Sequence, residues 1–237
     1  MQKKTIIITG ASRGIGRAIA RKLVAHNLVL LATNHNLLQQ LADEINQQGG
    51  SALPLVCDVT SEKDVTQAIK AAVDTFSTVD VVINNAGIGS FKRVDEFSLA
   101  EFEKIQRVNL SGTFLVCKAV APLFIEKKQG QIINISSVAG LNGFRTGTAY
   151  AASKFAVVGF SESLREDLKE FGIAVTVVCP GTVATEFGDS DLKKLQSSEY
   201  VLLPEDVAHT IQYLLEESEY SNTKLIELKP RRRKEFR

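Results

Sequence analysis

The sequence has 237 residues, of which 44% are hydrophobic, and its formal net charge is +1 at pH 7. A chain of this length can bury a substantial core, and the composition is that of an ordinary soluble globular protein. The nearly balanced charge gives no overall electrostatic reason to expect a nucleic acid or a membrane as partner.

Hydropathy and cysteine content limit the class of protein further. No apolar run approaches the length of about 18 residues that spans a bilayer, and the apolar segment after the basic start is too short for a signal peptide. Cys57, Cys117 and Cys179 lie far apart and the three histidines are scattered, so no metal site is expected. Buried reduced thiols of this kind are typical of a cytoplasmic protein.

Strand-like apolar runs alternate with amphipathic helical periodicity along the chain. This alternation predicts an α/β fold, with a parallel sheet covered by helices on both faces. No linker rich in Pro, Gly and Ser and no internal repeat divides the sequence, so we expect a single domain over residues 1–237. Strands are predicted at residues 4–9, 28–32, 52–57, 79–83, 131–136, 174–179 and 224–228, and helices at 15–25, 37–47, 62–76, 99–127, 149–171 and 204–215.

A glycine-rich turn joins the first predicted strand to the first predicted helix. Gly10, Gly14 and Gly16 let the backbone turn sharply and leave room for a pyrophosphate to approach it. The helix N-terminus supplies free N–H groups and a partial positive charge for that anion. A turn of this kind between a first strand and a helix predicts a dinucleotide-binding site.

The end of the second strand bears on which dinucleotide binds. In NAD-preferring sites an acidic residue here binds the ribose 2′-hydroxyl, but residues 31–35 contain no carboxylate. Arg13 in the glycine turn is placed to meet a 2′-phosphate, and Thr33 and Asn34 can donate hydrogen bonds to it. NADP(H) is therefore favoured over NAD(H). The alternative is that Arg13 is a solvated loop charge.

Polar and small residues follow the third and fourth strands. Asp58 either caps the next helix or hydrogen-bonds an adenine amino group. Residues 84–87, Asn-Asn-Ala-Gly, either let the backbone lie against a cofactor or form a tight turn stabilised by the asparagines. Asn109 lies in a helical pattern, where asparagine is unfavourable, among apolar neighbours. We expect its amide to serve something other than helix formation.

The stretch from residue 131 to residue 160 carries the candidate chemistry. A buried strand ends at Ser136-Ser137, and Tyr150 and Lys154 lie four residues apart on a helix, so they share one face. A tyrosine with a pKa near 10 is a poor acid or base at neutral pH, and a nearby positive charge lowers that pKa. Ser137 could hold a substrate oxygen while Tyr150 exchanges its proton. The alternative is an ordinary, partly exposed Tyr–Lys pair.

The segments after the sixth strand complete the predicted cleft. Residues 180–185 overhang the sheet edge and could hold a nicotinamide carboxamide. Residues 186–203 form either a lid over the substrate or a surface helix. Pocket walls are expected from residues 89–91, 141–145 and 187–200, where Arg145 either pairs with an anionic substrate or is a surface charge. The basic tail, residues 230–237, is expected to be solvated and to bind no nucleic acid.

Five signatures resemble those of the short-chain dehydrogenase/reductase family over essentially the whole chain. They are the turn at residues 9–16, the Asn-Asn-Ala-Gly at 84–87, Asn109, Ser137 thirteen residues before Tyr150-x-x-x-Lys154, and Pro180-Gly181 followed by Thr185. The resemblance implies a three-layer, doubly wound Rossmann-type parallel sheet of about seven strands. It also implies that family members are homodimers or homotetramers, through the long helices that begin near residues 99 and 149.

The same resemblance implies roles for a tetrad of side chains. Tyr150 would be the acid/base, and Ser137 would orient the carbonyl. Lys154 would lower the Tyr150 pKa and bind the nicotinamide ribose, and Asn109 would hold a water that leads protons to Lys154. Together with the patterns above, it predicts cofactor contacts by Gly10, Ser12, Arg13, Gly14, Ile15, Gly16, Thr33, Asn34, Asp58, Val59, Asn85, Ala86, Gly87, Tyr150, Lys154, Pro180, Gly181, Val183 and Thr185.

The expected function is NADP(H)-dependent interconversion of a small-molecule ketone or aldehyde and its alcohol. Residues 226–231 lack the Gly-Gly that usually follows the last strand in 3-oxoacyl-carrier-protein reductases. They look more like the branch that includes 3-hydroxy acid and serine dehydrogenases, so 3-oxoacyl and 3-hydroxy acid substrates both stay open. The alternative of another class is a non-catalytic, cofactor-binding regulatory or scaffold protein.

Overall fold

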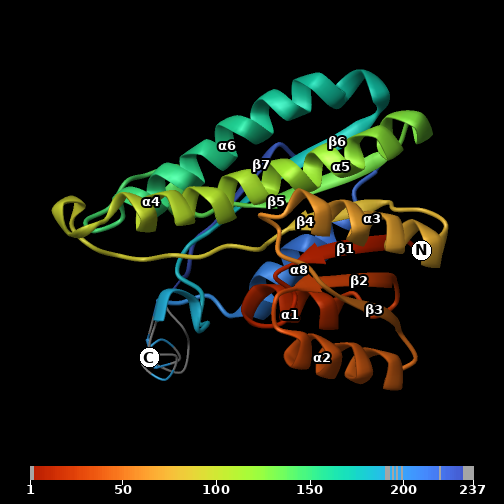
Figure 1. The fold of residues 1–237 in the computed structure, drawn as a ribbon, viewed down its shortest axis with the longest axis horizontal. Helices are drawn as coiled ribbons and strands as arrows, with labels where there is room; N and C mark the ends of the chain where they lie inside the picture. Colours follow the sequence, from red (N-terminus) through yellow and green to blue (C-terminus); the bar gives the residue numbers. More distant parts are fainter. Residues whose placement is uncertain are drawn as a thin grey trace.

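Seven parallel strands form one sheet in the order β3-β2-β1-β4-β5-β6-β7, which confirms the predicted doubly wound α/β fold (Figure 1). The computed structural model describes residues 3–189, 193, 195, 197, 198, 200–218 and 220–231. The strands are β1 (Thr5–Thr9), β2 (Asn27–Ala32), β3 (Ser51–Val56), β4 (Val81–Asn84), β5 (Gly130–Ile135), β6 (Ile173–Pro180) and β7 (Leu225–Leu228).

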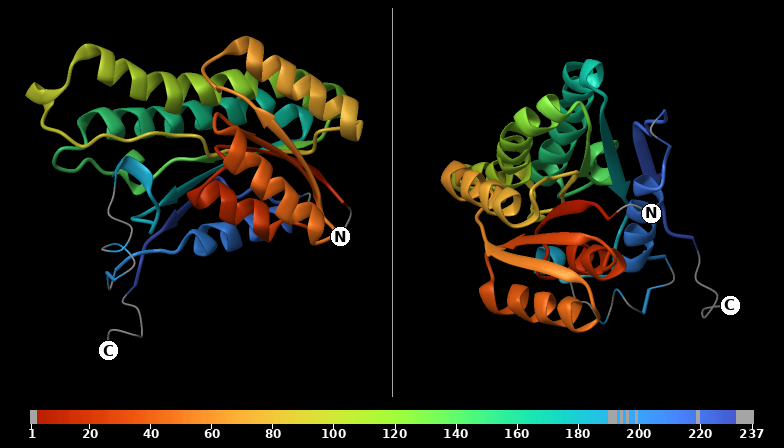
Figure 2. Two further views of the ribbon diagram at one scale, coloured as in Figure 1. Left: turned by 60° about the horizontal axis from the view of Figure 1, so that its bottom comes forward. Right: turned by 90° about the vertical axis from the view of Figure 1, so that its right-hand side faces the viewer.

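Helices cover both faces of the sheet, which is why its central strands are continuous apolar runs (Figure 2). Side chains alternate along β1: Ile6 and Ile8 join one core cluster and Ile7 joins the other. The first face packs against α1 (Gly14–Lys22), α2 (His35–Gln47) and α8 (Pro204–Leu215). The second packs against α3 (Glu62–Phe76), α5 (Gly112–Lys127) and the end of α6 (Thr148–Leu168).

The predicted helix over residues 99–127 has three parts. They are α4 (Leu99–Gln106), a five-residue π-helical segment η2 (Arg107–Ser111), and α5. A π-helical turn keeps the chain helical while changing which side chains face the core, and such turns are frequent at functional sites. Asn109 lies in this segment and is buried. Hydrophobic periodicity alone does not distinguish it from an α-helix.

This same stretch corrects the expectation that no apolar run approaches a membrane span. The helix over Leu99–Lys127 has 29 residues and a window of mean hydropathy 1.6, which satisfies the length and composition of a spanning helix. Core helices pass the same test when they cover a sheet. Val116, Val120 and Phe124 of this helix are fully buried in the core beside the sheet. Packing against the sheet therefore accounts for these apolar side chains.

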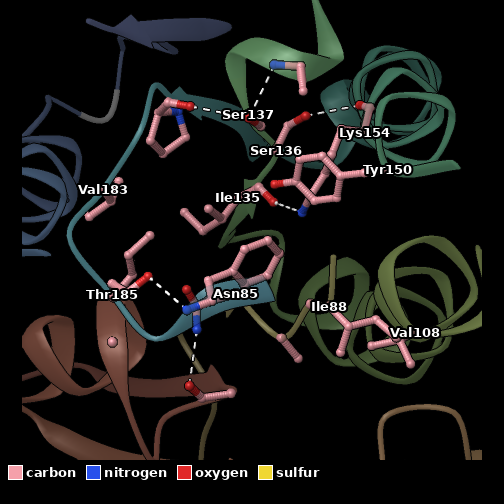
Figure 3. A pocket seen from close by; sticks show the side chains of 18 of the residues that line it. Asn85, Ile88, Val108, Ile135, Ser136, Ser137, Tyr150, Lys154, Val183 and Thr185 are labelled. Atoms are coloured by element: carbon pink, nitrogen blue, oxygen red, sulfur yellow. Dashed lines mark hydrogen bonds between the residues drawn. The ribbon is translucent and has the colours of Figure 1, made fainter. Parts of the chain in front are cut away.

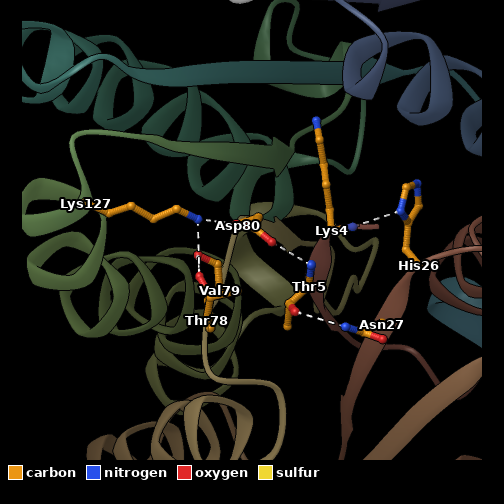
Figure 4. A network of polar contacts seen from close by, with 8 residues as sticks. All are labelled: Lys4, Thr5, His26, Asn27, Thr78, Val79, Asp80 and Lys127. Carbon is orange, nitrogen blue, oxygen red and sulfur yellow. Dashed lines mark hydrogen bonds and ion pairs between the residues drawn. The ribbon is translucent and has the colours of Figure 1, made fainter. Parts of the chain in front are cut away.

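A network of polar contacts connects neighbouring segments at the edge of the sheet where the strands begin (Figure 4). Asp80 accepts a hydrogen bond from the Thr5 backbone N–H at 2.7 Å and forms an ion pair with Lys127 at the end of α5. Beside it, the Lys4 backbone N–H donates to His26 Nδ1 at 3.2 Å. Burial lowers the His26 pKa. These contacts tie β1, β4 and α5 together at the edge opposite the strand ends that carry the predicted site.

Short 3₁₀ turns complete the described chain. They are η1 (Val94–Glu96), η3 (Val138–Gly140), η4 (Lys169–Phe171) and η5 (Phe187–Asp189). Two of them, η3 and η5, follow β5 and β6 and therefore lie at the carboxyl edge of the sheet. Residues 190–192, 194, 196 and 199 of the predicted lid and residues 232–237 of the basic tail fall outside the described residues.

Candidate active site

A cleft of about 840 Å³ opens at the carboxyl ends of the strands (Figure 3). Its walls come from the turn between β1 and α1, the loops after β3, β4, β5 and β6, and the start of α6. It spans the point between β1 and β4 where the strand order reverses, which is where open α/β sheets bind ligands. The volume falls in the range of cofactor and substrate pockets.

The glycine turn has a conformation and packing that other residues would not tolerate. Gly10 and Gly14 have φ of +64° and +54°, in the left-handed region that favours glycine. A Cβ on Gly10 would lie 2.9 Å from the Ala86 Cα, and a Cβ on Gly16 would lie 2.3 Å from the Gly10 carbonyl oxygen. The N-terminus of α1 has no side-chain cap, so its backbone N–H groups face the cleft as a cradle for a phosphate.

Asn85 holds this turn in place. Its Nδ2 donates hydrogen bonds to the carbonyl oxygens of Thr9, at 2.9 Å, and Gly10, at 3.1 Å. The Thr9 Oγ1 accepts the backbone N–H groups of Asn85 and Ala86 at 3.0 and 2.9 Å. Asn85 also lines the cleft. The Asn85 side chain thus stabilises the glycine turn after β1, and its bonds do not close a turn within the Asn-Asn-Ala-Gly segment itself.

The loop after β6 lies against the same turn. Thr185 is buried, and a Cβ on Gly14 would lie 3.2 Å from the Thr185 Cγ2. Val183 forms an isolated parallel bridge with Leu202, which closes the base of the excursion predicted as a lid. Within the described residues, the start of this loop therefore lies against the glycine turn through Thr185, and the chain comes back beside Val183 at Leu202.

Arg13 and Thr33 line the cleft near the end of β2, whereas Asn34 does not. The Asn34 Oδ1 accepts the Leu37 backbone N–H at 3.0 Å, which makes Asn34 the N-cap of α2. A side chain held this way satisfies a helix end. The cap engages the Asn34 Oδ1, whereas the predicted contact with a 2′-phosphate uses its Nδ2 as donor, so that contact stays a prediction.

Asp58 lines the cleft but does not cap α3. Its Oδ1 accepts both the backbone N–H and the hydroxyl of Thr60, at 2.9 and 2.8 Å. Ser61 is the N-cap of α3, where its side chain accepts the Asp64 N–H. The capping alternative for Asp58 is therefore wrong, because a residue three positions later fills that place.

The two serines at the end of β5 have different surroundings. The Ser136 hydroxyl is buried and donates to the Lys154 carbonyl oxygen at 2.9 Å, which fixes β5 against α6. The Ser137 hydroxyl donates to the Pro180 carbonyl oxygen at 3.3 Å and accepts the Ala139 N–H at 3.1 Å. Ser137 and Tyr150 line the same cleft, and the Ser137 side chain exerts a lowering influence on the Tyr150 pKa.

Tyr150 and Lys154 project from one face of α6 into the cleft. The Lys154 Nζ lies 5.8 Å from the centroid of the Tyr150 ring and donates to the Ile135 carbonyl oxygen at 2.9 Å. Burial raises the pKa of Tyr150 to about 12 and lowers the pKa of Lys154 to about 8. The lowered tyrosine pKa expected from the sequence is therefore wrong for the protein alone, because desolvation by burial outweighs the lowering influence of Ser137.

Asn109 lies behind the cleft and does not line it. Its Nδ2 donates to the Ile88 carbonyl oxygen and to the Ser153 Oγ, both at 2.9 Å, and its Oδ1 accepts the Ile88 N–H at 2.8 Å. A Cβ on Gly87 would lie 3.3 Å from the Asn109 Oδ1 and 3.6 Å from the Lys154 Nζ. The amide therefore fixes the loop after β4 against α6, which confirms that it does something other than support its own helix.

Most of the predicted site residues meet in this cleft. Of the residues predicted to bind cofactor or to catalyse, Gly16, Asn34 and Asn109 do not line it. The predicted walls at 89–91, 141–145 and 187–200 contribute Phe91, Asn142, Gly143, Phe144, Phe187 and Leu195, whereas Arg145 is exposed and does not contribute. The sequence interpretation missed Cys57, Ile88, Val108, Ile135 and Lys229 among the lining residues.

The missed residues differ in how far the sequence alone could have placed them at the cleft. Cys57 and Ile135 stand at the ends of predicted strands, so their place at the carboxyl edge could have been deduced. Ile88 directly follows the Asn-Asn-Ala-Gly segment and had the same signal. Lys229 follows the last strand, and its approach depends on the pairing of β6 with β7, which no local pattern gives.

Comparisons with known proteins agree with this geometry. A family model described as short chain dehydrogenase matches residues 4–196. A 3-oxoacyl-[acyl-carrier-protein] reductase of Synechocystis sp. is 36% identical over 216 residues, which are 88% of this chain and 87% of that protein. The chain belongs to the short-chain dehydrogenase family, oxidoreductases that act on the CH–OH/C=O pair with a nicotinamide cofactor.

Two solved structures illustrate the likeness. An alcohol dehydrogenase from the archaeon Thermococcus sibiricus, complexed with 5-hydroxy-NADP, has a TM-score of 0.89 and 29% identity, covering 97% of both chains. A 3-oxoacyl-[acyl-carrier protein] reductase from Brucella melitensis with bound NAD has a TM-score of 0.85 and 32% identity, covering 95% of this chain and 89% of that one. Similar proteins thus bind either dinucleotide.

Proposed function

We propose that this protein is an NADP(H)-dependent oxidoreductase that interconverts a ketone or aldehyde and its alcohol, with Tyr150 as the acid/base. The observation that supports this most strongly is that the side chains of Ser137 and Tyr150 line one cleft whose other end is the glycine turn. Two hydroxyls that meet there can both reach one carbonyl oxygen. The glycine turn fits a dinucleotide, because Gly10, Gly14 and Ile15 line the cleft where α1 begins without a side-chain cap.

The chain's own residues handle the oxygen and its proton. A reduced nicotinamide bound in the cleft supplies the hydride that the carbonyl carbon receives. The Tyr150 hydroxyl gives its proton to the carbonyl oxygen, and the Ser137 hydroxyl donates a hydrogen bond to the same oxygen. The C=O thereby becomes CH–OH and Tyr150 becomes a phenolate. The Lys154 ammonium, 5.8 Å from the ring centroid, favours that phenolate over the neutral phenol.

Lys154 is suited to return the proton. Burial lowers its pKa to about 8, far closer to neutral pH than an exposed lysine. Asn109 contributes by position: both hydrogens of its Nδ2 are engaged by Ile88 and Ser153, so it holds the loop after β4 against α6. A water on the path to Lys154 would bind beside this amide.

The preference for NADP(H) follows from charge at the adenosine end. Arg13 is exposed at the start of α1 and lines the cleft together with Thr33. A guanidinium is well matched to a phosphate, and β2 ends without a carboxylate to bind a free 2′-hydroxyl. The NADP-derived ligand of the Thermococcus sibiricus structure supports this choice. The Brucella melitensis structure contains NAD, so the preference of this protein between the two dinucleotides has to be measured.

We also propose a homodimer or homotetramer. Leu99, Phe102, Phe114 and Phe155 are exposed by 71%, 37%, 46% and 46% on α4, α5 and α6. Exposed apolar side chains gathered on neighbouring helices are characteristic of subunit interfaces. Sedimentation velocity gives the assembly state directly.

The test of the proposed function is a panel of neutral and anionic ketones and aldehydes with NADPH or NADH, followed by the loss of nicotinamide absorbance. We expect turnover of at least one member, faster with NADPH. No turnover across a broad panel by protein that binds NADPH would contradict catalysis and favour a cofactor-binding regulatory role.

A further inference from the structure

Three phenylalanine rings stand around the Tyr150 ring at the mouth of the cleft, and we call Phe91, Phe144 and Phe187 the aromatic wall. The Phe91 and Phe187 ring centroids lie 5.6 and 5.5 Å from the Tyr150 centroid, with interplanar angles of 78° and 59°. Phe144 extends the wall, 5.8 Å from Phe91. These are edge-to-face and tilted contacts, the arrangements that aromatic rings prefer.

Glycines make room for each ring. A Cβ on Gly89 would lie 2.6 Å from the Phe187 Cε1, and a Cβ on Gly188 would lie 2.8 Å from the Phe91 Cε2. The ring of Phe187, in the loop after β6, thus packs on Gly89 of the loop after β4. In return, the ring of Phe91 packs on Gly188. Phe144 is seated in the same way, because a Cβ on Gly147 would lie 2.4 Å from its ring. The aromatic wall is therefore built by the packing of three loops, those after β4, β5 and β6, and is more than a chance exposure of apolar side chains.

Charge at this end of the cleft disfavours an anion. Among the described lining residues, the basic ones are Arg13, Lys154 and Lys229. Arg13 belongs to the glycine turn, Lys154 donates to the Ile135 carbonyl oxygen, and Lys229 pairs with Glu227 at 2.9 Å. Glu186, next to Phe187, also lines the cleft and is exposed. Among the described residues that line the cleft, the loops that carry the aromatic wall therefore contribute the carboxylate of Glu186 and no arginine or lysine.

Resting on the oxidoreductase function proposed above, we infer that the substrate is a neutral carbonyl compound that carries an aryl group on or next to the carbonyl carbon. A carbonyl whose oxygen binds the Ser137 and Tyr150 hydroxyls places its substituents beside Phe91 and Phe187. A flat ring can adopt the same tilted contacts that the wall already makes with Tyr150, whereas an alkyl group gains only burial. The reaction balances, because the carbonyl carbon receives one hydride and the carbonyl oxygen receives one proton.

The experiment compares three substrates that share a 2-oxo group: ethyl benzoylformate (neutral, aryl), benzoylformate (anionic, aryl) and ethyl pyruvate (neutral, alkyl). We expect kcat/KM for ethyl benzoylformate to exceed each of the others at least tenfold. Gly89→Ala and Phe187→Leu should each reduce that preference at least fivefold while the Kd for NADPH stays within twofold. Gly159→Ala, on a helix where an added Cβ meets nothing within 4 Å, is the matched control and should change neither quantity.

A binding measurement separates this inference from the proposed function. Calorimetry on the NADP⁺ complex of the Tyr150→Phe variant compares the same three compounds without turnover. Binding of ethyl benzoylformate at least tenfold tighter than that of benzoylformate supports the inference even where no reduction occurs, a result that would count against catalysis alone. Equal or tighter binding of the anion or of ethyl pyruvate overturns it. So does a preference that survives both Gly89→Ala and Phe187→Leu in protein that circular dichroism shows to be folded.

Discussion

The Lys154 ammonium donates a 2.9 Å hydrogen bond to the carbonyl oxygen of Ile135, the last residue of β5. This bond joins α6 to the strand that ends in the candidate catalytic serine, and Ser136 makes a second link to the Lys154 carbonyl oxygen. The face of α6 that carries Tyr150 is therefore fixed against the sheet by the protein's own contacts. A preorganised site loses less free energy in orienting its groups during reaction.

Burial of Lys154 predicts a dependence of stability on pH. Its pKa is about 8 in the folded protein against an ordinary value of 10.5, so the unfolded chain binds more protons between these values. Its contribution to stability therefore rises as pH rises through this window. Chemical denaturation at both ends should show the free energy of unfolding of the wild type increasing relative to Lys154→Met. A difference that is flat or falls with pH contradicts the prediction.

Arg13 is predicted to select the dinucleotide. Arg13→Gln should weaken NADPH binding at least tenfold and change NADH binding less than twofold, because only NADPH carries the 2′-phosphate. The Kd values are measured by nicotinamide fluorescence at fixed ionic strength, since the contact is screened by salt. Arg17→Gln is the matched control, because Arg17 lies one turn further along α1 and does not line the cleft. Equal losses for both cofactors would assign Arg13 to the pyrophosphate or to solvent.

Asp80 is predicted to stabilise the fold at the opposite edge of the sheet. It accepts the Thr5 N–H and pairs with Lys127, and the two side chains are only 22% and 32% exposed. Asp80→Asn should lower the free energy of unfolding by about 1–3 kcal/mol, the range for hydrogen bonds to charged groups. Asp74→Asn breaks the exposed pair with Lys70 and should cost under about 0.5 kcal/mol. Equal effects in urea denaturation would contradict the structural role given to Asp80.

The order of strands and helices and the position of the cleft could be predicted from the sequence. Apolar runs of β-branched residues marked the buried strands, and the strand ends of a parallel sheet gather at one edge. The residues after β1, β4, β5 and β6 therefore met as expected. Ser137 and Tyr150 are the clearest case, because one follows a strand, the other lies in the first turn of the next helix, and both line the cleft.

Features that depend on nonlocal packing could not be predicted. Asn85 was assigned to the cofactor because of its place in the chain, yet its amide is engaged by the glycine turn, 75 positions and more away in the sequence. The raised pKa of Tyr150 results from burial by segments far apart in sequence. The packing of Phe187 on Gly89 brings together two loops nearly one hundred positions apart along the chain. Neither loop has a sequence pattern that predicts this contact.

The central claim is that Tyr150 exchanges the proton beside a bound nicotinamide. Tyr150→Phe removes one hydroxyl and leaves the ring that packs against Phe91 and Phe187. The account predicts that this variant loses at least about a hundredfold in kcat for any carbonyl that the wild type reduces, because general acid catalysis contributes roughly 10²–10⁴-fold. Its Kd for NADPH, measured by calorimetry, stays within about twofold. Turnover within tenfold of the wild type by the folded, NADPH-binding variant would contradict it.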